Sequence, residues 1–186
     1  MEMKKLIPLL MIVAVLFAGC TPYSELVPQT PRDVLDVAMY VVTGGSNPAP
    51  LVVGADGSPG ALRAPTGLAA QISAKVTCEV VSLTENGDTA AAVLNITAPD
   101  AVGLFYQALE GMKTYDEEAF TEKFEGLLAD APTKVFPVEL ELVRLEGVWC
   151  IQINEDFSNA ITGGLMAEYT AVQQAILDKL TEGGEG

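Results

Sequence analysis

The chain contains no histidine among its 186 residues. Histidine is the side chain that most often serves as a general base near neutral pH, and it is the commonest metal ligand. Its absence excludes a Ser-His-Asp or Cys-His catalytic site built within this chain, and a zinc site with a histidine ligand. Chemistry that uses carboxylates alone, including calcium binding, remains open.

Basic residues are also scarce, with 10 Lys and Arg against 25 Asp and Glu and a formal net charge of −15. Such a surface repels the phosphate backbone of nucleic acids and the head groups of anionic lipids. We therefore expect no nucleic-acid partner, and a domain that stands off the membrane surface. Two roles for the charge stay open: solubility, or the binding of cations and basic partners.

Charge is absent from residues 6–18, an apolar run that follows Lys4 and Lys5. At ~1.5 Å per residue, a helix over this run is about 20 Å long, whereas the hydrocarbon core of a bilayer is ~30 Å thick. The run is therefore too short for a spanning helix and is typical of a signal peptide.

The apolar run closes with Ala18-Gly19-Cys20, which resembles the lipobox of bacterial lipoproteins, although Phe17 stands where Leu is usual. The resemblance implies that Cys20 receives a diacylglyceryl group and becomes the first residue of the mature protein. Two acyl chains, at ~0.8 kcal/mol per buried CH₂, bind a membrane more firmly than one. We expect a signal peptide over 1–19, a tether over 20–29, and a lipid anchor on the extracytoplasmic side of the cell membrane. An ordinary secretory leader is the alternative.

Cleavage before Cys20 leaves 167 residues with eight basic and 24 acidic side chains, a formal charge of −16, because two lysines and one glutamate leave with the leader. This length suits a single domain with a hydrophobic core. Two cysteines remain, Cys78 and Cys150, and both fall in expected strands. A disulfide between them is allowed outside the cytoplasm, and two buried free thiols are the alternative.

Hydrophobic periodicity predicts one α+β domain over residues 30–180 and a polar tail over 181–186. Helices are expected over 30–42, 68–73, 100–112, 114–131, 157–162 and 165–180, and strands over 74–84, 88–97, 134–144 and 148–154. Asn86-Gly87 and Glu146-Gly147 are expected to form the hairpin turns. Helix caps are expected at Thr30, Asp100, Thr114 and Asp156.

The segment 44–67 is rich in proline and glycine and shows no clear periodicity. A structureless segment of this length is uncommon in a compact domain. We expect an insertion, which is either mobile or folded over a ligand, and the short run 51–53 could form a strand within it.

Four pieces of the chain, residues 95–100, 140–142, 147–151 and 160–164, resemble small bacterial surface lipoproteins with a nuclear-transport-factor-two-like (cystatin-like) domain. These are related to the lumazine-binding-like lipoproteins of unknown function, and the resemblance spans residues 31–164. It implies a curved antiparallel sheet of about four main strands, packed on helices as a cone with a pocket, plus a C-terminal helix. The wider superfamily contains enzymes, ligand binders and dimerisation modules, so the fold alone does not choose a function.

The leading hypothesis is a lipid-anchored, non-catalytic module that binds a protein or small ligand, or pairs with a second copy. An isomerase-like or dehydratase-like enzyme and a calcium-dependent structural or adhesion module are the alternatives. Sequence spacing brings together no two of the residues that an enzyme could use, which are Asp100, Glu139, Glu141, Asp156, Tyr106 and Tyr169. Trp149 and Tyr106 could contact a ligand or belong to the core. We expect no cofactor and no metal, and assign a site only to Cys20.

Overall fold

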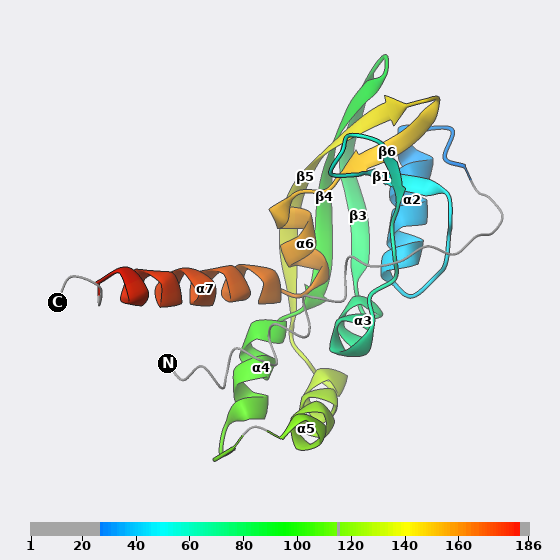
Figure 1. Ribbon diagram of the computed structural model, residues 1–186. Coiled ribbons are helices and arrows are strands. Elements are labelled where there is room, and N and C mark those ends of the chain that lie inside the picture. Colours follow the sequence, from blue (N-terminus) through cyan, green and yellow to red (C-terminus); the bar gives the residue numbers. More distant parts are fainter. Residues whose placement is uncertain (1–26, 115, 183–186) are drawn as a thin grey trace.

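The computed structural model describes residues 27–114 and 116–182, and their side chains as far as residue 174 (Figure 1). The expected signal peptide, most of the tether and Cys20 lie outside these residues. Within the described residues, no helix is both long enough and apolar enough to cross a membrane.

Six helices and six strands make up the part of the chain that the structure describes. The helices are α2 (Pro31–Val42), α3 (Gly67–Ser73), α4 (Ala101–Leu109), α5 (Glu117–Ala129), α6 (Glu155–Ile161) and α7 (Leu165–Glu182). The strands are β1 (Pro50–Val53), β2 (Pro59–Ala61), β3 (Thr77–Asn86), β4 (Thr89–Pro99), β5 (Thr133–Leu145) and β6 (Val148–Gln152). The expected α+β class, with a sheet packed on helices and a long C-terminal helix, is confirmed.

The sheet has six strands in the order β2-β1-β6-β5-β4-β3, so β2 and β3 form its two edges. All neighbours are antiparallel except β1 and β6, which run parallel, with Val52 beside Ile151. The expectation of about four main strands therefore did not include β1 and β2, which both come from segment 44–67. The short strand that the run 51–53 allowed is β1, whereas β2 was not expected. Leu51 explains why this segment is not structureless: its side chain is fully buried, and that burial holds β1 in the sheet.

The turns of the two expected hairpins each contain two residues, but only one lies where the sequence predicted it. The β5–β6 turn is Glu146-Gly147, with φ of 52° and 85°, as a type I′ turn requires. In the β3–β4 hairpin, Asn86 pairs with Thr89, so the turn is Gly87-Asp88, one residue later than expected. Gly87 supplies the positive φ of 67° that the first turn position needs.

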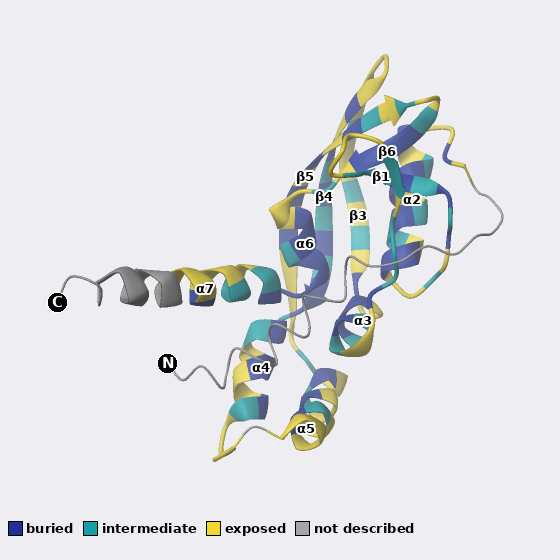
Figure 2. Cartoon of the chain, viewed as in Figure 1, coloured by how far each residue is buried: buried dark blue, intermediate teal, exposed yellow. Residues whose placement is uncertain are grey.

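One face of the sheet is buried against α2 and α6, as Figure 2 shows by the alternation of colours along the strands. Every second side chain along β4 and β5 enters this core, and the intervening ones are exposed or half-buried. The buried set on the two strands is Ala90, Ala92, Leu94, Ile96, Ala98, Phe136, Val138, Leu140 and Leu142. Each fully buried large side chain contributes about 1.5–3 kcal/mol, so this face dominates the stability of the sheet.

Helix α2 begins as the sequence predicted. The Thr30 hydroxyl accepts a hydrogen bond from the Asp33 backbone N–H at 3.1 Å, and the Asp33 carboxylate accepts one from the Thr30 N–H at 3.0 Å. This reciprocal capping box satisfies N–H groups that have no partner within the helix.

Two of the other expected helix caps are wrong. Helix α5 is capped by Asp116 rather than Thr114, and α6 is capped by Asn154 rather than Asp156. Each observed cap accepts a hydrogen bond from the backbone N–H three residues later, at 3.0 Å for Asp116 and 2.9 Å for Asn154. Both lie at the true start of their helix, since a cap must precede the first helical residue.

A second hydrophobic core lies at the lower end of the sheet in Figure 1, where α3, α4 and α5 gather beside the start of α7. Its centre is aromatic: the ring centroids of Phe105 and Phe120 lie 5.4 Å apart in an edge-to-face arrangement, and Phe124 lies 5.9 Å beyond Phe120. Such aromatic pairs add about 0.5–1.5 kcal/mol to the effect of burial alone.

Two lysines hold these helices by their C-terminal ends. Lys75 Nζ donates to the carbonyl oxygens of Leu128 and Ala129 at 2.7 and 3.0 Å, at the end of α5. Lys123 Nζ donates to the carbonyl oxygen of Glu110 at 2.8 Å, at the end of α4. A cation at this position satisfies carbonyls that lack a helical partner and interacts favourably with the helix dipole.

The sheet and the second core meet at Gly163, in the turn between α6 and α7. The Ala101 N–H donates to the Gly163 carbonyl oxygen at 3.0 Å, at the point where β4 passes into α4. Gly163 has a φ of +61°, and a Cβ atom there would lie only 2.2 Å from the Pro99 carbonyl oxygen. Glycine is therefore required both by the backbone conformation and by this close approach.

We predict that Gly163→Ala lowers the free energy of unfolding by ~2–4 kcal/mol, because it adds a backbone clash to the strain of a positive φ. Gly57→Ala is the matched control, since Gly57 has a φ of +79° and open space around it. The control should cost only ~1 kcal/mol. Urea denaturation of both variants measures the difference, and equal losses would refute the close contact.

Candidate functional site

Three of the four predicted carboxylates come together on the surface of the sheet. Glu139 and Glu141 lie on β5, on the face opposite the core, and Asp156 lies in the first turn of α6. All three line one shallow hollow of about 670 Å³. Asp100 does not line it: it occupies the N-cap position of α4, where its side chain makes no capping hydrogen bond.

The β4–β5 pairing forms the floor of this hollow. Glu139 lies directly opposite Val93 and Glu141 opposite Ala91, so acidic and small apolar side chains alternate across the two strands. The start of α6 is held against β5 because Asn154 Nδ2 donates to the Glu139 carbonyl oxygen at 2.7 Å. This contact places Asp156 beside strand residues that precede it by about fifteen positions in the chain.

The geometry of the hollow suits binding better than acid–base catalysis. General acids and bases of the isomerase or dehydratase type work in sites that exclude water and shift their pKa values towards neutrality. Here Glu139, Glu141 and Asp156 are all exposed, on an open strand surface. Such a surface can attract a cation or a basic side chain.

The two candidate phenols lie away from the hollow. Tyr106 on α4 donates its hydroxyl hydrogen to the Glu168 carboxylate on α7, and so joins the two helices. Burial, followed by this hydrogen bond and the glutamate's charge, raises the pKa of Tyr106 to about 12. Tyr169 accepts a hydrogen bond from Gln173 Nε2 at 2.6 Å within α7. Trp149 is 1% exposed and belongs to the core.

Cys78 lines a smaller groove of about 290 Å³ between α2 and β3. At the rim of this groove, Arg32 Nε donates to the Asp36 carboxylate at 3.0 Å. Burial raises the pKa of the Cys78 thiol, and Arg32 opposes that shift. Burial likewise raises the pKa of the Cys150 thiol on β6.

The disulfide that the sequence allowed between Cys78 and Cys150 is not formed, and both cysteines are free. β4 and β5 lie between β3 and β6 in the sheet, so the two Cα atoms are at least about 14 Å apart. A disulfide needs Cα atoms within ~7 Å. The order of the strands, which spacing along the chain does not reveal, excludes the bridge.

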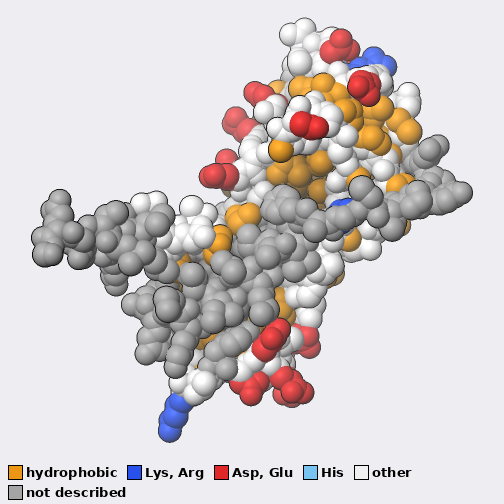
Figure 3. All heavy atoms as spheres, in the orientation of Figure 1, with side chains coloured by type: hydrophobic (Ala, Val, Ile, Leu, Met, Phe, Trp, Pro, Cys, Tyr) orange, Lys and Arg blue, Asp and Glu red, His pale blue; other side chains and the backbone are white. Residues whose placement is uncertain are grey.

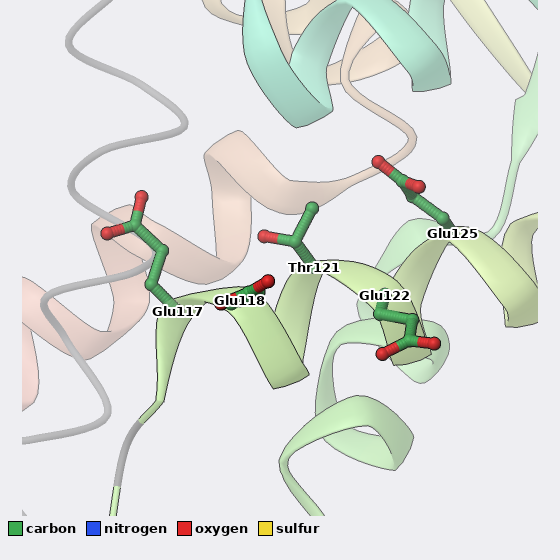
Figure 4. Close-up of a pocket in the computed structure, with 5 residues that line it drawn as sticks. All are labelled: Glu117, Glu118, Thr121, Glu122 and Glu125. Atoms are coloured by element: carbon green, nitrogen blue, oxygen red, sulfur yellow. The ribbon is translucent and has the colours of Figure 1, made fainter.

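The acidic run at the start of α5 includes the helix cap, because the Asp116 side chain accepts a hydrogen bond from the Ala119 N–H. Along the same helix, four glutamates and a threonine line a surface hollow of about 650 Å³. Figure 4 shows the carboxylates of Glu117, Glu122 and Glu125 pointing in different directions. Among the described residues, no group of three or more carboxylate or thiol side chains is arranged to hold a metal ion.

We predict that a thiol reagent in denaturant detects two free thiols, those of Cys78 and Cys150, in the Cys20→Ala variant. In native buffer Cys78 should react first, because it is half-buried, and Cys150 only on unfolding, because it is fully buried. Cys78→Ser should remove the native reaction and leave one thiol in denaturant. A count of zero in denaturant would contradict the strand order.

We predict a high-pH step in stability that depends on Tyr106. A raised pKa in the folded state means that the phenol's contribution is complete below pH ~10 and is lost as the pH rises towards 12. The loss should be modest, because Tyr106 is 38% exposed and water screens it. Ultraviolet titration of phenolate, with melting curves, should show the step removed in Tyr106→Phe and retained in Tyr40→Phe. In Glu168→Gln the step should move to lower pH.

No protein-family model matches the chain, and searches of curated proteins and of solved structures also find no match. The resemblance to lipoproteins with a nuclear-transport-factor-two-like domain therefore stays a prediction from the sequence.

Proposed function

We propose that the chain is a lipoprotein, anchored on the extracytoplasmic side of the cell membrane by a diacylglyceryl group on Cys20, and that its domain is a non-catalytic binding module. The observation that carries the binding role is the outward surface of β3, β4 and β5. This surface is exposed and acidic, and two of its side chains, Glu139 and Glu141, also line the hollow at the start of α6.

The chain length between the anchor and the domain supports this arrangement. Helix α2 begins at Pro31, and residues 20–29 can span at most about 35 Å when fully extended. A domain with a formal charge of −16 is repelled by anionic head groups, so a tether of this length lets it stand clear of them.

The anchor is tested by growing cells with a clickable fatty acid and recovering the protein. We expect label on the wild-type chain and none on Cys20→Ala. Cys78→Ala is the matched control, because it removes a thiol that lies within the fold, and it should keep the label. Equal labelling of wild type and Cys20→Ala would refute the anchor.

A further inference from the structure

We infer that the outward surface of β3, β4 and β5, here called the open face, is a docking site for a basic, amphipathic polypeptide segment of a partner protein. The inference rests on the proposed binding function and adds the chemistry of the partner. Three observations carry it: the open face is uncovered, it has carboxylates but no cations, and its area fits a single helix or strand.

Within the described residues, the open face is uncovered, because α2 and α6, which share a core with the sheet, lie on its other side. Their side chains share one core with the inward residues of β4 and β5. On the open face Val81 and Val135 are each 54% exposed, whereas inward residues such as Val138 are 1% exposed. Exposed valines at this level provide apolar contact area that water now covers.

A β-bulge increases the apolar character of the open face. Leu94 pairs with Val80 and Val93 pairs with Ser82, so Val81 is an extra residue on β3. In a bulge, two residues of one strand oppose a single residue of its neighbour. Val81 is thereby displaced from the regular alternation and exposed beside Ser82, next to the half-buried Val93.

The charges of the open face are all of one sign. Glu79, Glu139 and Glu141 occupy outward positions, while residues 77–99 contain no Lys or Arg at all. The two basic residues of β5 occupy positions on the inward side of the strand. The Lys134 Nζ atom lies over the Phe136 ring, and Arg144 lies opposite Trp149 in the β5–β6 pairing. Charge complementarity therefore favours a basic partner.

A second copy of this chain does not fit the open face. It would bring the same carboxylates opposite one another, and each copy carries a formal charge of −15. Three strands ~4.8 Å apart, with β3 and β4 paired at nine positions of ~3.4 Å each, give a shared area of about 400 Å². Stable protein–protein interfaces need about 800 Å² on each partner, so the open face fits one segment rather than a whole domain.

The spacing of the carboxylates matches basic residues on one face of a helix. Glu139 and Glu141 are two residues apart on a strand, about 7 Å, and Glu79 lies about 12 Å from Glu139 across β4. Helical residues three or four apart are separated by ~5–6 Å, and those seven apart by about 10 Å. Apolar side chains between them would meet Val93 and Ala91.

Figure 3, which shows one side of the molecule, has acidic side chains at its upper left margin and around its lower end, where α5 lies. The second group provides a matched control. Glu117, Glu118 and Glu122 are exposed and solvent-facing on α5, outside the open face. Replacing three glutamates at either place changes the net charge equally, so only a specific site distinguishes the two variants.

The test measures binding of a fluorescent Lys/Leu amphipathic helical peptide to the full lipoprotein in neutral detergent micelles. The variant E79Q/E139Q/E141Q should weaken binding about tenfold, since three exposed charge pairs contribute about 0.5 kcal/mol each. The control E117Q/E118Q/E122Q should change affinity by less than about twofold. Amide chemical shifts should move on β3, β4 and β5.

The apolar part of the site is tested by V81S/V135S, which should weaken binding about fivefold because two valines no longer contribute their buried area. Melting temperatures near that of the wild type show that each variant is folded. Equal losses in the two glutamine variants would overturn the inference, since they indicate unspecific attraction. An unchanged affinity of V81S/V135S would also overturn it, because the peptide would then be held by charge alone and not by its apolar side.

The experiments can refute the lipid anchor and the docking site independently of each other. Cys20→Ala should bind the peptide with unchanged affinity even though it takes up no fatty acid. Absence of label on the wild-type chain, together with tight peptide binding, would therefore remove the anchor and leave the docking site. Normal labelling with no peptide binding would overturn the docking site alone.

Discussion

The alternation of side chains along β4 and β5 is the constraint on which the rest of the structure depends. Even-numbered positions from Ala90 to Ala98 and from Phe136 to Leu142 are buried, so α2 and α6 must lie on that face. The odd-numbered positions are thereby committed to the opposite face. The core and the open face are two consequences of the same pattern, and neither can change without the other.

Several of the few basic residues have structural roles in the helices. Lys75 and Lys123 are used at the C-terminal ends of α5 and α4, and Arg32 is paired with Asp36. These cations stabilise helices rather than neutralise the sheet. The carboxylates of the open face are therefore left without cations on the same face, which is the condition under which a surface attracts a basic partner from solution.

The sequence predicted those parts of the fold that depend on local patterns. Thr30 with Asp33 marked the start of α2, Glu146-Gly147 marked a turn, and alternation marked the main strands. It allowed a short strand at 51–53 but could not predict its partner, since the parallel pairing of Val52 with Ile151 joins residues about a hundred positions apart. Non-local pairing leaves little trace in local composition, and the prolines and glycines of segment 44–67 pointed to a loop.

The candidate site was missed for the same reason. The alternation along β5 places Glu139 and Glu141 on the outward face, but nothing in the spacing along the chain brings Asp156 beside them. That proximity depends on one contact, from Asn154 Nδ2 to the Glu139 carbonyl oxygen, and on Asn154 rather than Asp156 being the helix cap. A cap that is misplaced by two residues rotates the first turn of a helix by about 200°. A small error in a local assignment thus hides which side chains share a surface.

The proposed tether and the open face reinforce each other physically. A tether of residues 20–29 keeps the start of the domain within about 35 Å of the membrane surface. A partner that is also held at that surface is then present at a high effective concentration. A site of about 400 Å² with a few charge pairs supplies only weak affinity by itself. Confinement of both proteins raises the occupancy of such a site without any further contact. A shallow, acidic surface is therefore sufficient for an anchored protein, whereas a protein free in solution would need a larger interface.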